Sequence, residues 1–357
     1  MELKIKTVEL QDMVGKAIRC ASNNKLIPLT SLMNIKVEDG LLTLTTTDAT
    51  NYFYTQAEVM CDDFEVSVIA DLFTKLIQKT TSESVTMYVK NGAFIVQGNG
   101  SYTMELPLDE NGAVIKFPTK IKAEFRKDAG IIKSSTIKNL LNYNKPSLAV
   151  STELPSLTCY YCGDSVVTSD RFKICNNAVK VFDEPTLITA QLMELLGVIS
   201  SENITVMRGE NELIFEGKDD IVYAPITEGI ETFPYEAIMS LVNSEFESNC
   251  KISRVAVLNL IERLNLFVSP YDKRAVRMTF TKDGVMFSSK KSSGVELIPY
   301  VDNSNPVDYT CMVDIEMLRS QVTSQTGETI NLYYGSDIAI KMVCDNITQI
   351  VALAEDD

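Results

Sequence analysis

The sequence predicts an α+β protein made of three tandem copies of one domain, each a set of helices with an antiparallel sheet. Its 357 residues divide into thirds of 119, a common size for one domain. The segment that starts with Ile69-Ala70-Asp71 recurs twice further along the chain. Three glutamates that follow the copies, Glu83, Glu202 and Glu328, lie 119 and 126 residues apart.

A turn between two alternating strands marks the other half of each copy. It reads Asp39-Gly40, Gly163-Asp164 and Asp283-Gly284, and the three turns begin 124 and 120 residues apart. Pairs of this kind favour the tight turns of β-hairpins. Each domain is therefore expected to contain two halves, each with a helix and its strands.

Apolar residues three, four or seven positions apart predict a helix upstream of each turn. They are Leu10, Met13, Val14 and Ala17 in the first copy, Ile137, Leu140 and Leu141 in the second, and Leu258, Ile261 and Leu264 in the third. The stretches Leu42-Thr43-Leu44-Thr45 and Thr86-Met87-Tyr88-Val89 alternate strictly. Such alternation is typical of antiparallel sheet with one covered face.

Connectors that contain proline separate the copies, because proline does not suit a central strand. Phe117-Pro118 follows the first copy and Phe233-Pro234 follows the second. The predicted domains are residues 1–120, 121–236 and 237–357.

Charge and composition restrict the function. The chain has 33 basic and 48 acidic residues, a net charge of −15, so any contact with nucleic acid must be local. It has no histidine, which excludes Ser/His/Asp and Cys/His nucleophilic sites and zinc motifs with two histidines. We expect no enzyme, no catalytic residue, no metal and no cofactor.

The compartment is predicted from two further features. No apolar run approaches the ~18 residues of a membrane span, so we expect a soluble protein without membrane contact. The eight cysteines are scattered, which fits reduced, packed thiols and a cytoplasmic location. The C-x-x-C stretch Cys159-Tyr160-Tyr161-Cys162 is expected in a strand, whose residues three apart point to opposite faces; zinc or redox use is the alternative.

Three stretches resemble a known family. They are Lys25-Leu26-Ile27-Pro28-Leu29-Thr30-Ser31, Thr168-Ser169-Asp170-Arg171-Phe172-Lys173-Ile174-Cys175 and Phe233-Pro234-Tyr235. With the threefold repeat, they make the chain similar to the bacterial sliding clamp, the β subunit of DNA polymerase III. The chain departs from the family pattern at Arg171 and Phe172, which replace a small residue and a histidine.

The resemblance implies a DNA clamp fold that forms a ring. A head-to-tail homodimer would close six domains around duplex DNA, with helices lining the hole. The ring would act as a processivity factor that tethers replicative DNA polymerase and other replication and repair proteins. Enclosure needs only weak phosphate contacts, so the acidic exterior is no objection.

The same resemblance implies that basic residues on the polar faces of helices contact DNA. The residues are Lys16, Arg19, Lys25, Lys75, Lys79, Lys138 and Arg319. Lys75 and Lys79, for example, would lie opposite Leu72, Leu76 and Ile77. The alternative is an ordinary solvated helix face, because acidic residues lie close by.

The family also implies a cleft that receives short linear peptides from polymerase and clamp-loader subunits. Carried over by position, its residues are Leu154, Ser169, Arg171, Phe172, Lys173, Ile174, Pro234, Ile238, Ile350 and Ala352. The alternative for Ile174, Ile238 and Ile350 is an ordinary place in the core. Arg171 is expected to narrow the cleft or to change the preferred peptide.

Contacts between the two chains of the ring would join strand edges. The matching positions are Tyr102 and Met104 on an edge-like strand, with Phe267 and Val268 after a helix. Covering exposed apolar groups at a strand edge prevents aggregation. Burial in the core of one chain is the alternative.

Two other functions remain open from the sequence. One is a diverged clamp homologue of a mobile element that competes for the host's clamp-binding proteins. The other, from a different class, is a cytoplasmic enzyme that uses carboxylates or thiols.

Overall fold

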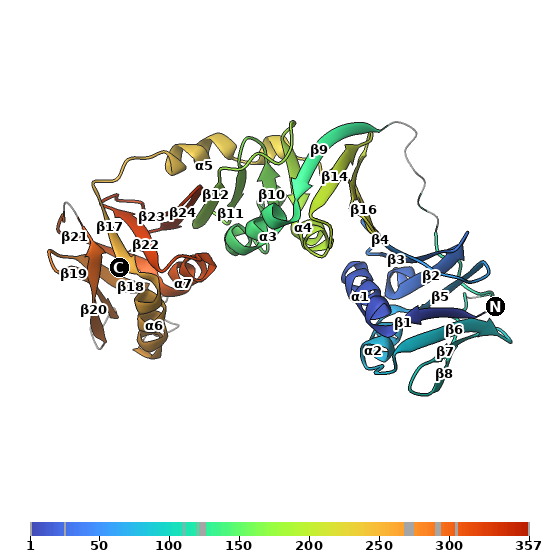
Figure 1. Cartoon of the computed structure of the whole chain (residues 1–357). Helices are drawn as coiled ribbons and strands as arrows, with labels where there is room; N and C mark the ends of the chain where they lie inside the picture. Colours follow the sequence, from blue (N-terminus) through green and yellow to red (C-terminus); the bar gives the residue numbers. More distant parts are fainter. Residues whose placement is uncertain are drawn as a thin grey trace. The chain divides into compact units, whose positions relative to one another are not determined.

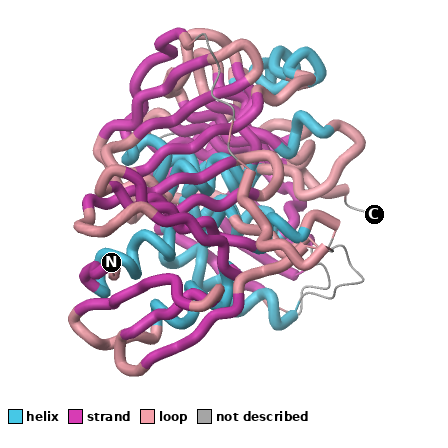
Figure 2. The backbone as a smooth tube through the Cα atoms, turned by 90° about the vertical axis from the view of Figure 1, so that its right-hand side faces the viewer, coloured by secondary structure: helices cyan, strands magenta, loops and turns pink. Residues whose placement is uncertain are grey.

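The structure is a computed structural model of the whole chain. It describes residues 2–24, 26–109, 111–118, 120, 126–267, 275–289, 294–303 and 306–355. Strands predominate over helices in this part of the chain, as Figure 2 shows in magenta and cyan. Lys25 and Val268 lie outside the described residues.

The chain forms two compact units. The first contains Met1–Ile137 and Gln191–Ile226, and the second contains Lys138–Ala190 and Thr227–Asp357. The boundary between the units therefore falls within the second copy of the repeat.

One order of elements occurs three times: a strand, a helix, four strands, a second helix and three strands. The first copy consists of β1 (Leu3–Lys6), α1 (Thr7–Ala17), β2 (Leu32–Glu38), β3 (Leu41–Thr47), β4 (Tyr52–Glu58), β5 (Phe64–Ile69), α2 (Ala70–Gln78), β6 (Ser84–Lys90), β7 (Ala93–Gln97) and β8 (Ser101–Glu105).

The second copy has the same order. Its elements are β9 (Lys127–Lys133), α3 (Ser134–Tyr143), β10 (Cys159–Cys162), β11 (Val166–Ser169), β12 (Lys173–Asn177), β13 (Thr186–Thr189), α4 (Ala190–Gly197), β14 (Asn203–Arg208), β15 (Glu212–Glu216) and β16 (Asp220–Pro225). The helix α5 (Tyr235–Val242) follows it.

The third copy completes the pattern. Its elements are β17 (Ser248–Ser253), α6 (Arg254–Leu264), β18 (Ala275–Phe280), β19 (Gly284–Ser289), β20 (Val295–Asp302), β21 (Tyr309–Asp314), α7 (Ile315–Ser324), β22 (Thr329–Tyr334), β23 (Ala339–Cys344) and β24 (Ile347–Ala352). The predicted α+β class with three tandem copies is confirmed.

The strands form three antiparallel sheets, each within one unit. The first unit contains the four-stranded sheet β1-β6-β7-β8 and the eight-stranded sheet β5-β2-β3-β4-β16-β15-β14-β9. The second unit contains the twelve-stranded sheet β13-β10-β11-β12-β24-β23-β22-β17-β20-β19-β18-β21. Neighbouring copies are thus joined by strand pairs, β4 with β16 and β12 with β24.

Helices of one copy pack in pairs. In the first unit α1 contacts α2, and in the second unit α6 contacts α7, as Figure 1 shows for each pair. The apolar stripe predicted for α1 is buried, and so are Ile261 and Leu264 of α6. The stripe of α2 differs from the prediction: Ala70, Phe73 and Ile77 are buried, whereas Leu72 is 53% exposed.

Lys16 is buried, contrary to its predicted place on a polar helix face. Its Nζ lies 2.7 Å from Asp12 Oδ2 and 3.2 Å from Asp220 Oδ2, and Asp220 is only 1% exposed. Burial acts to lower the pKa of Lys16, but the hydrogen bond to Asp12 and the charge of Asp220 outweigh it, so the pKa is raised. The ion pair joins α1 of the first copy to β16 of the second.

We predict that Lys16→Met lowers the free energy of unfolding by about 3–5 kcal/mol, because it leaves the Asp220 carboxylate buried without its cation. The matched control is Lys75→Met, which breaks the exposed pair between Lys75 Nζ and Asp71 Oδ2 at 2.7 Å. The control should cost less than about 1 kcal/mol. Urea unfolding checks both, and equal losses would contradict the structural role of Lys16.

Candidate functional site

The residues predicted for the peptide cleft all lie in the second unit, several of them where β12 pairs with β24. Ile174 and Ile350 are direct partners in this pair. Both are buried in one apolar cluster with Ile238 of α5, and Leu154 is partly buried against the same cluster. The three isoleucines are thus buried in the core, which was the alternative for them, while Leu154 is partly exposed.

Stacked aromatic rings fix the connector that crosses this junction. The Tyr161 ring on β10 lies between Phe233, at 4.9 Å between centroids, and Tyr235, at 4.6 Å. Pro234 therefore lies between two anchored residues. Tyr161, Phe233 and Tyr235 were not among the predicted site residues, although the Phe-Pro-Tyr stretch in the sequence had pointed to this connector.

The turn between β11 and β12 has a defined hydrogen-bond pattern. Asp170 Oδ1 accepts from the backbone N–H groups of Phe172 at 3.0 Å and Lys173 at 2.6 Å. The buried Ser169 side chain accepts from Arg171 N at 3.1 Å, and Phe172 O accepts from Ala352 N at 2.8 Å. These bonds hold the turn and tie it to the end of β24.

Arg171 has a φ of +78°, in the left-handed region that favours glycine. This conformation gives a physical reason for the small residue at this position in the sliding-clamp pattern. A side chain with a Cβ is strained there. Arg171 therefore occupies its position at a cost in stability.

A hollow of about 720 Å³ lies beside this turn, and residues 145–146, 148–153 and 170–173 line it. Phe172 and Val150 are exposed at it. Lys173 spans it, because its Nζ donates to Pro146 O and forms an ion pair with Asp170 at 3.3 Å.

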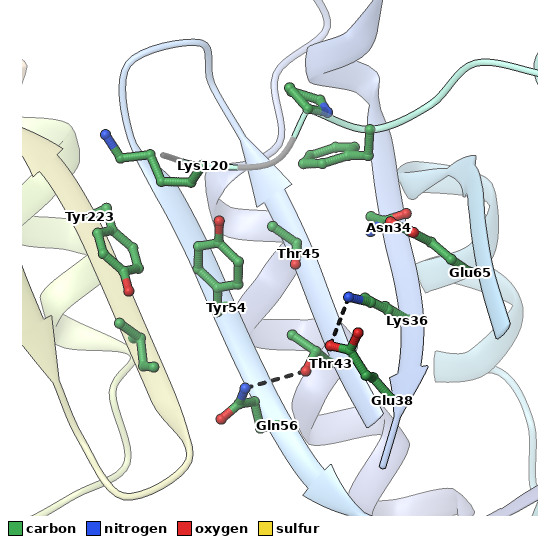
Figure 3. A pocket seen from close by; sticks show the side chains of 13 residues that line it. Asn34, Lys36, Glu38, Thr43, Thr45, Tyr54, Gln56, Glu65, Lys120 and Tyr223 are labelled. Carbon is green, nitrogen blue, oxygen red and sulfur yellow. Dashed lines mark hydrogen bonds and ion pairs between the residues drawn. The ribbon is translucent and has the colours of Figure 1, made fainter. Parts of the chain in front are cut away.

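The equivalent junction in the first unit has a different chemistry. There the connector residues Phe117 and Pro118 border a pocket of about 340 Å³ over β3, β4 and β16. Figure 3 shows that most side chains around it are polar. Among them, Gln56 Nε2 donates a hydrogen bond to Thr43 Oγ1 at 3.3 Å. The pocket at the first junction is therefore mainly polar.

The predicted basic residues occupy separate places. Arg19, Lys75 and Lys79 are exposed in the first unit, and Lys138 and Arg319 are exposed in the second. Two of them have carboxylate neighbours on their own helix: Lys75 pairs with Asp71, and Arg319 lies 3.8 Å from Glu316. Lys16 presents no accessible ammonium, so it does not fit the predicted polar face.

Of the residues predicted to contact a second chain, only some are exposed. Tyr102 on β8 and Phe267 after α6 are exposed, whereas Met104 is 6% exposed and opposite Phe94 in the sheet. Met104 is thus covered within one chain.

The sequence analysis did not identify an apolar face on β20. Val295, Leu297 and Val301 alternate along this strand and are exposed. Their alternation was the available signal.

The C-x-x-C stretch forms β10, as predicted, and both cysteines are free thiols. Burial raises the pKa of Cys159 and of Cys162. A raised pKa disfavours the thiolate that redox or metal chemistry needs. No helix in the described ranges is long and apolar enough to cross a membrane.

The first part of the chain is similar to a known protein family. Residues 1–111 match the family model described as DNA polymerase III beta subunit, N-terminal domain. Residues 1–111 are therefore similar to the N-terminal domain of that subunit. No curated protein sequence matches the chain.

Solved sliding clamps share the fold along the whole chain. The beta subunit from Streptococcus pyogenes is 14% identical, with a TM-score of 0.85 over 99% of this chain and 100% of that one. The Thermotoga maritima beta subunit is 15% identical, with a TM-score of 0.85 over 99% of both chains. The Bacillus subtilis sliding clamp is 14% identical, with a TM-score of 0.84 over 99% of both. The whole chain therefore has the sliding-clamp fold.

We predict that Arg171→Gly raises the free energy of unfolding by roughly 0.5–1 kcal/mol, because glycine adopts a positive φ without a Cβ clash. Arg171→Ala is the control, since it removes the charge and the long side chain but keeps the Cβ. Chemical denaturation measures both. An equal gain in the two variants would show that the backbone conformation is not the source of strain.

Proposed function

We propose that the chain is a DNA sliding clamp, a non-enzymatic processivity factor that encircles duplex DNA as a homodimeric ring. The observation that carries this proposal is the match of fold over 99% of the chain, together with the family match of the first domain. The ring would tether replicative DNA polymerase and other replication and repair proteins. Neither a competing mobile-element homologue nor an enzyme is favoured by these comparisons.

Ring closure is proposed from the repeat itself. β4 pairs with β16 and β12 with β24, and the strands in the corresponding places of the third and first copies are β20 and β8. Within the chain β20 pairs with β19 and, at Tyr300 and Asp302, with β17, so its first half keeps one edge for a further strand. We propose that β8 of one chain pairs with β20 of a second, so that two chains supply six domains, 1–120, 121–236 and 237–357 in each. Tyr102, Phe267 and the exposed face of β20 would be covered there.

Contact with DNA is proposed for exposed cations on the helices or directly after them. These are Arg19, Lys75, Lys79, Lys138 and Arg319. Weak, sequence-independent phosphate contacts suffice for a protein that encloses its DNA. A net charge of −15 then limits unproductive binding elsewhere on the surface.

Protein partners are proposed at the cleft of the second unit. Short linear peptides of polymerase and clamp-loader subunits would place hydrophobic anchors against Leu154 and Pro234, above the buried isoleucines. Anchors in a desolvated pocket supply most of the energy of such an interface. We place this activity in the cytoplasm.

We predict that the protein, once a clamp-loader ATPase has loaded it on nicked circular DNA, stays bound at salt that abolishes direct binding. Surface attraction weakens steeply with salt, whereas a closed ring leaves only when an end is available. Linearising the circle should therefore release it, as measured by gel filtration of the labelled protein with DNA. Identical retention on circular and linear DNA would refute enclosure.

A charge-matched pair of variants tests the helix cations in the same assay. Lys79→Glu with Lys138→Glu should impair loading, because Lys138 is exposed on α3 and Lys79 is exposed directly after α2, where phosphate contacts are proposed. Lys180→Glu with Lys282→Glu changes the net charge equally at exposed lysines outside the helices. Equal impairment of loading by both pairs would show that the change in net charge, and not the position of the lysines, causes the loss.

A further inference from the structure

The pocket at the junction of β4 and β16 contains hydroxyl groups that lack partners. Thr45 of β3 and Tyr223 of β16 line it, although each is only 5% exposed. β4 lies between these two strands, and its Tyr54 is opposite Thr45 and edge to face with Tyr223 (Figure 3). In the described part of the chain, no group forms a hydrogen bond with any of these three hydroxyls. Burying a hydroxyl without a partner costs free energy, so this pocket calls for water or a ligand.

The charged groups around the pocket are already paired. Lys36 Nζ lies 2.8 Å from Glu38 Oε2, and Lys120 Nζ lies 2.9 Å from Glu212 Oε2. The carboxylate of Glu65 accepts a hydrogen bond of 2.8 Å from an asparagine side chain. Two lysines and two glutamates line the pocket, so its described wall has no net charge. An ionic ligand therefore finds no excess of opposite charge there.

The groups without partners are uncharged and can both donate and accept. Burial raises the pKa of Tyr54, so its hydroxyl keeps its proton. Threonine and tyrosine hydroxyls rotate to suit the group that they meet. The hydroxyls of a ligand have the same double capacity, so a ligand with several of them matches this set better than a ligand with fixed donors or acceptors.

Apolar surface completes the pocket. Phe117 and Pro118 of the connector and Ile221 of β16 line it beside the tyrosine rings. Aromatic rings offer flat apolar area next to a polar group. The wall thus combines a surface for the C–H groups of a ring with hydroxyls for the edge of that ring.

We propose that this pocket binds an uncharged sugar. The hydroxyls of the sugar would exchange hydrogen bonds with Thr45, Tyr54 and Tyr223, and its C–H face would contact Phe117. β3 and β4 belong to the first copy and β16 to the second, so the bound sugar would contact both copies and stabilise their junction. The proposal holds whether or not the chain closes into a ring.

Saturation-transfer NMR titrations of the full-length protein with single sugars test the proposal. The probes are D-ribose, D-glucose, D-galactose, N-acetyl-D-glucosamine and trehalose. Two further compounds are matched controls. Cyclohexanol keeps a ring but has a single hydroxyl, and a phosphate ester of glucose adds negative charge to the sugar.

At least one of these sugars should bind wild type saturably. Cyclohexanol should bind at least about tenfold more weakly than that sugar, because it leaves the hydroxyls of the pocket unpaired. Esterified glucose should bind no more tightly than glucose, since the wall has no excess of positive charge.

Variants that remove one hydroxyl locate the sugar. Tyr54→Phe, Tyr223→Phe and Thr45→Val keep the shape of each side chain and should each lower the affinity about three- to tenfold. Tyr161→Phe is the matched control, because it removes a tyrosine hydroxyl at the junction in the second unit and should leave the affinity unchanged. Urea unfolding confirms that each variant is folded.

Three outcomes would overturn the proposal. The first is failure of every sugar in the set to bind wild type. The second is equal affinity of wild type, Tyr54→Phe and Tyr223→Phe, which would place the sugar elsewhere on the chain. The third is tighter binding of the phosphate ester than of glucose, which would assign the pocket to an anion. Retention on circular DNA is a separate measurement, so none of these outcomes decides the proposed clamp function.

Discussion

Strands that pair across the boundaries between copies hold this fold together. Ile221 of β16 is opposite Tyr54 of β4, and Ile350 of β24 is opposite Ile174 of β12. Unpaired edge strands are prone to aggregation, so each boundary pair protects two edges while it sets the position of the next copy. At the first junction the connector residues Phe117 and Pro118 line the pocket.

The two junctions have equivalent strand pairs but different side chains around them. In the first unit Tyr54 and Tyr223 meet edge to face at 5.5 Å between centroids, in a pocket lined by polar groups (Figure 3). In the second unit Ile174 and Ile350 are direct partners across the equivalent strand pair, and the neighbouring turn carries Arg171. Selectivity for a peptide then depends on side chains that the strand pairing leaves free to vary.

Much of the fold could be predicted from the sequence because repeated turns and apolar spacings are local signals. The environment of individual side chains was harder to predict. Lys16 has the helical position of a solvated residue, but its partner Asp220 is 204 residues away in the sequence. The stripe of α2 was misplaced, because Leu72 and Phe73 are adjacent and only packing decides which is buried. For the candidate site, the cleft residues are proposed from the resemblance, whereas the strained backbone of Arg171 could be found only from coordinates.

The most direct test is amide hydrogen exchange of β8 as the protein concentration rises. If the strand-pairing rule extends to a second chain, Ser101–Glu105 and the first half of β20 should gain protection together. Phe267→Asp should abolish that protection while leaving exchange in β4 and β16 unchanged. Fast exchange in β8 and β20 at every concentration, with the mass of a single chain, would contradict the account.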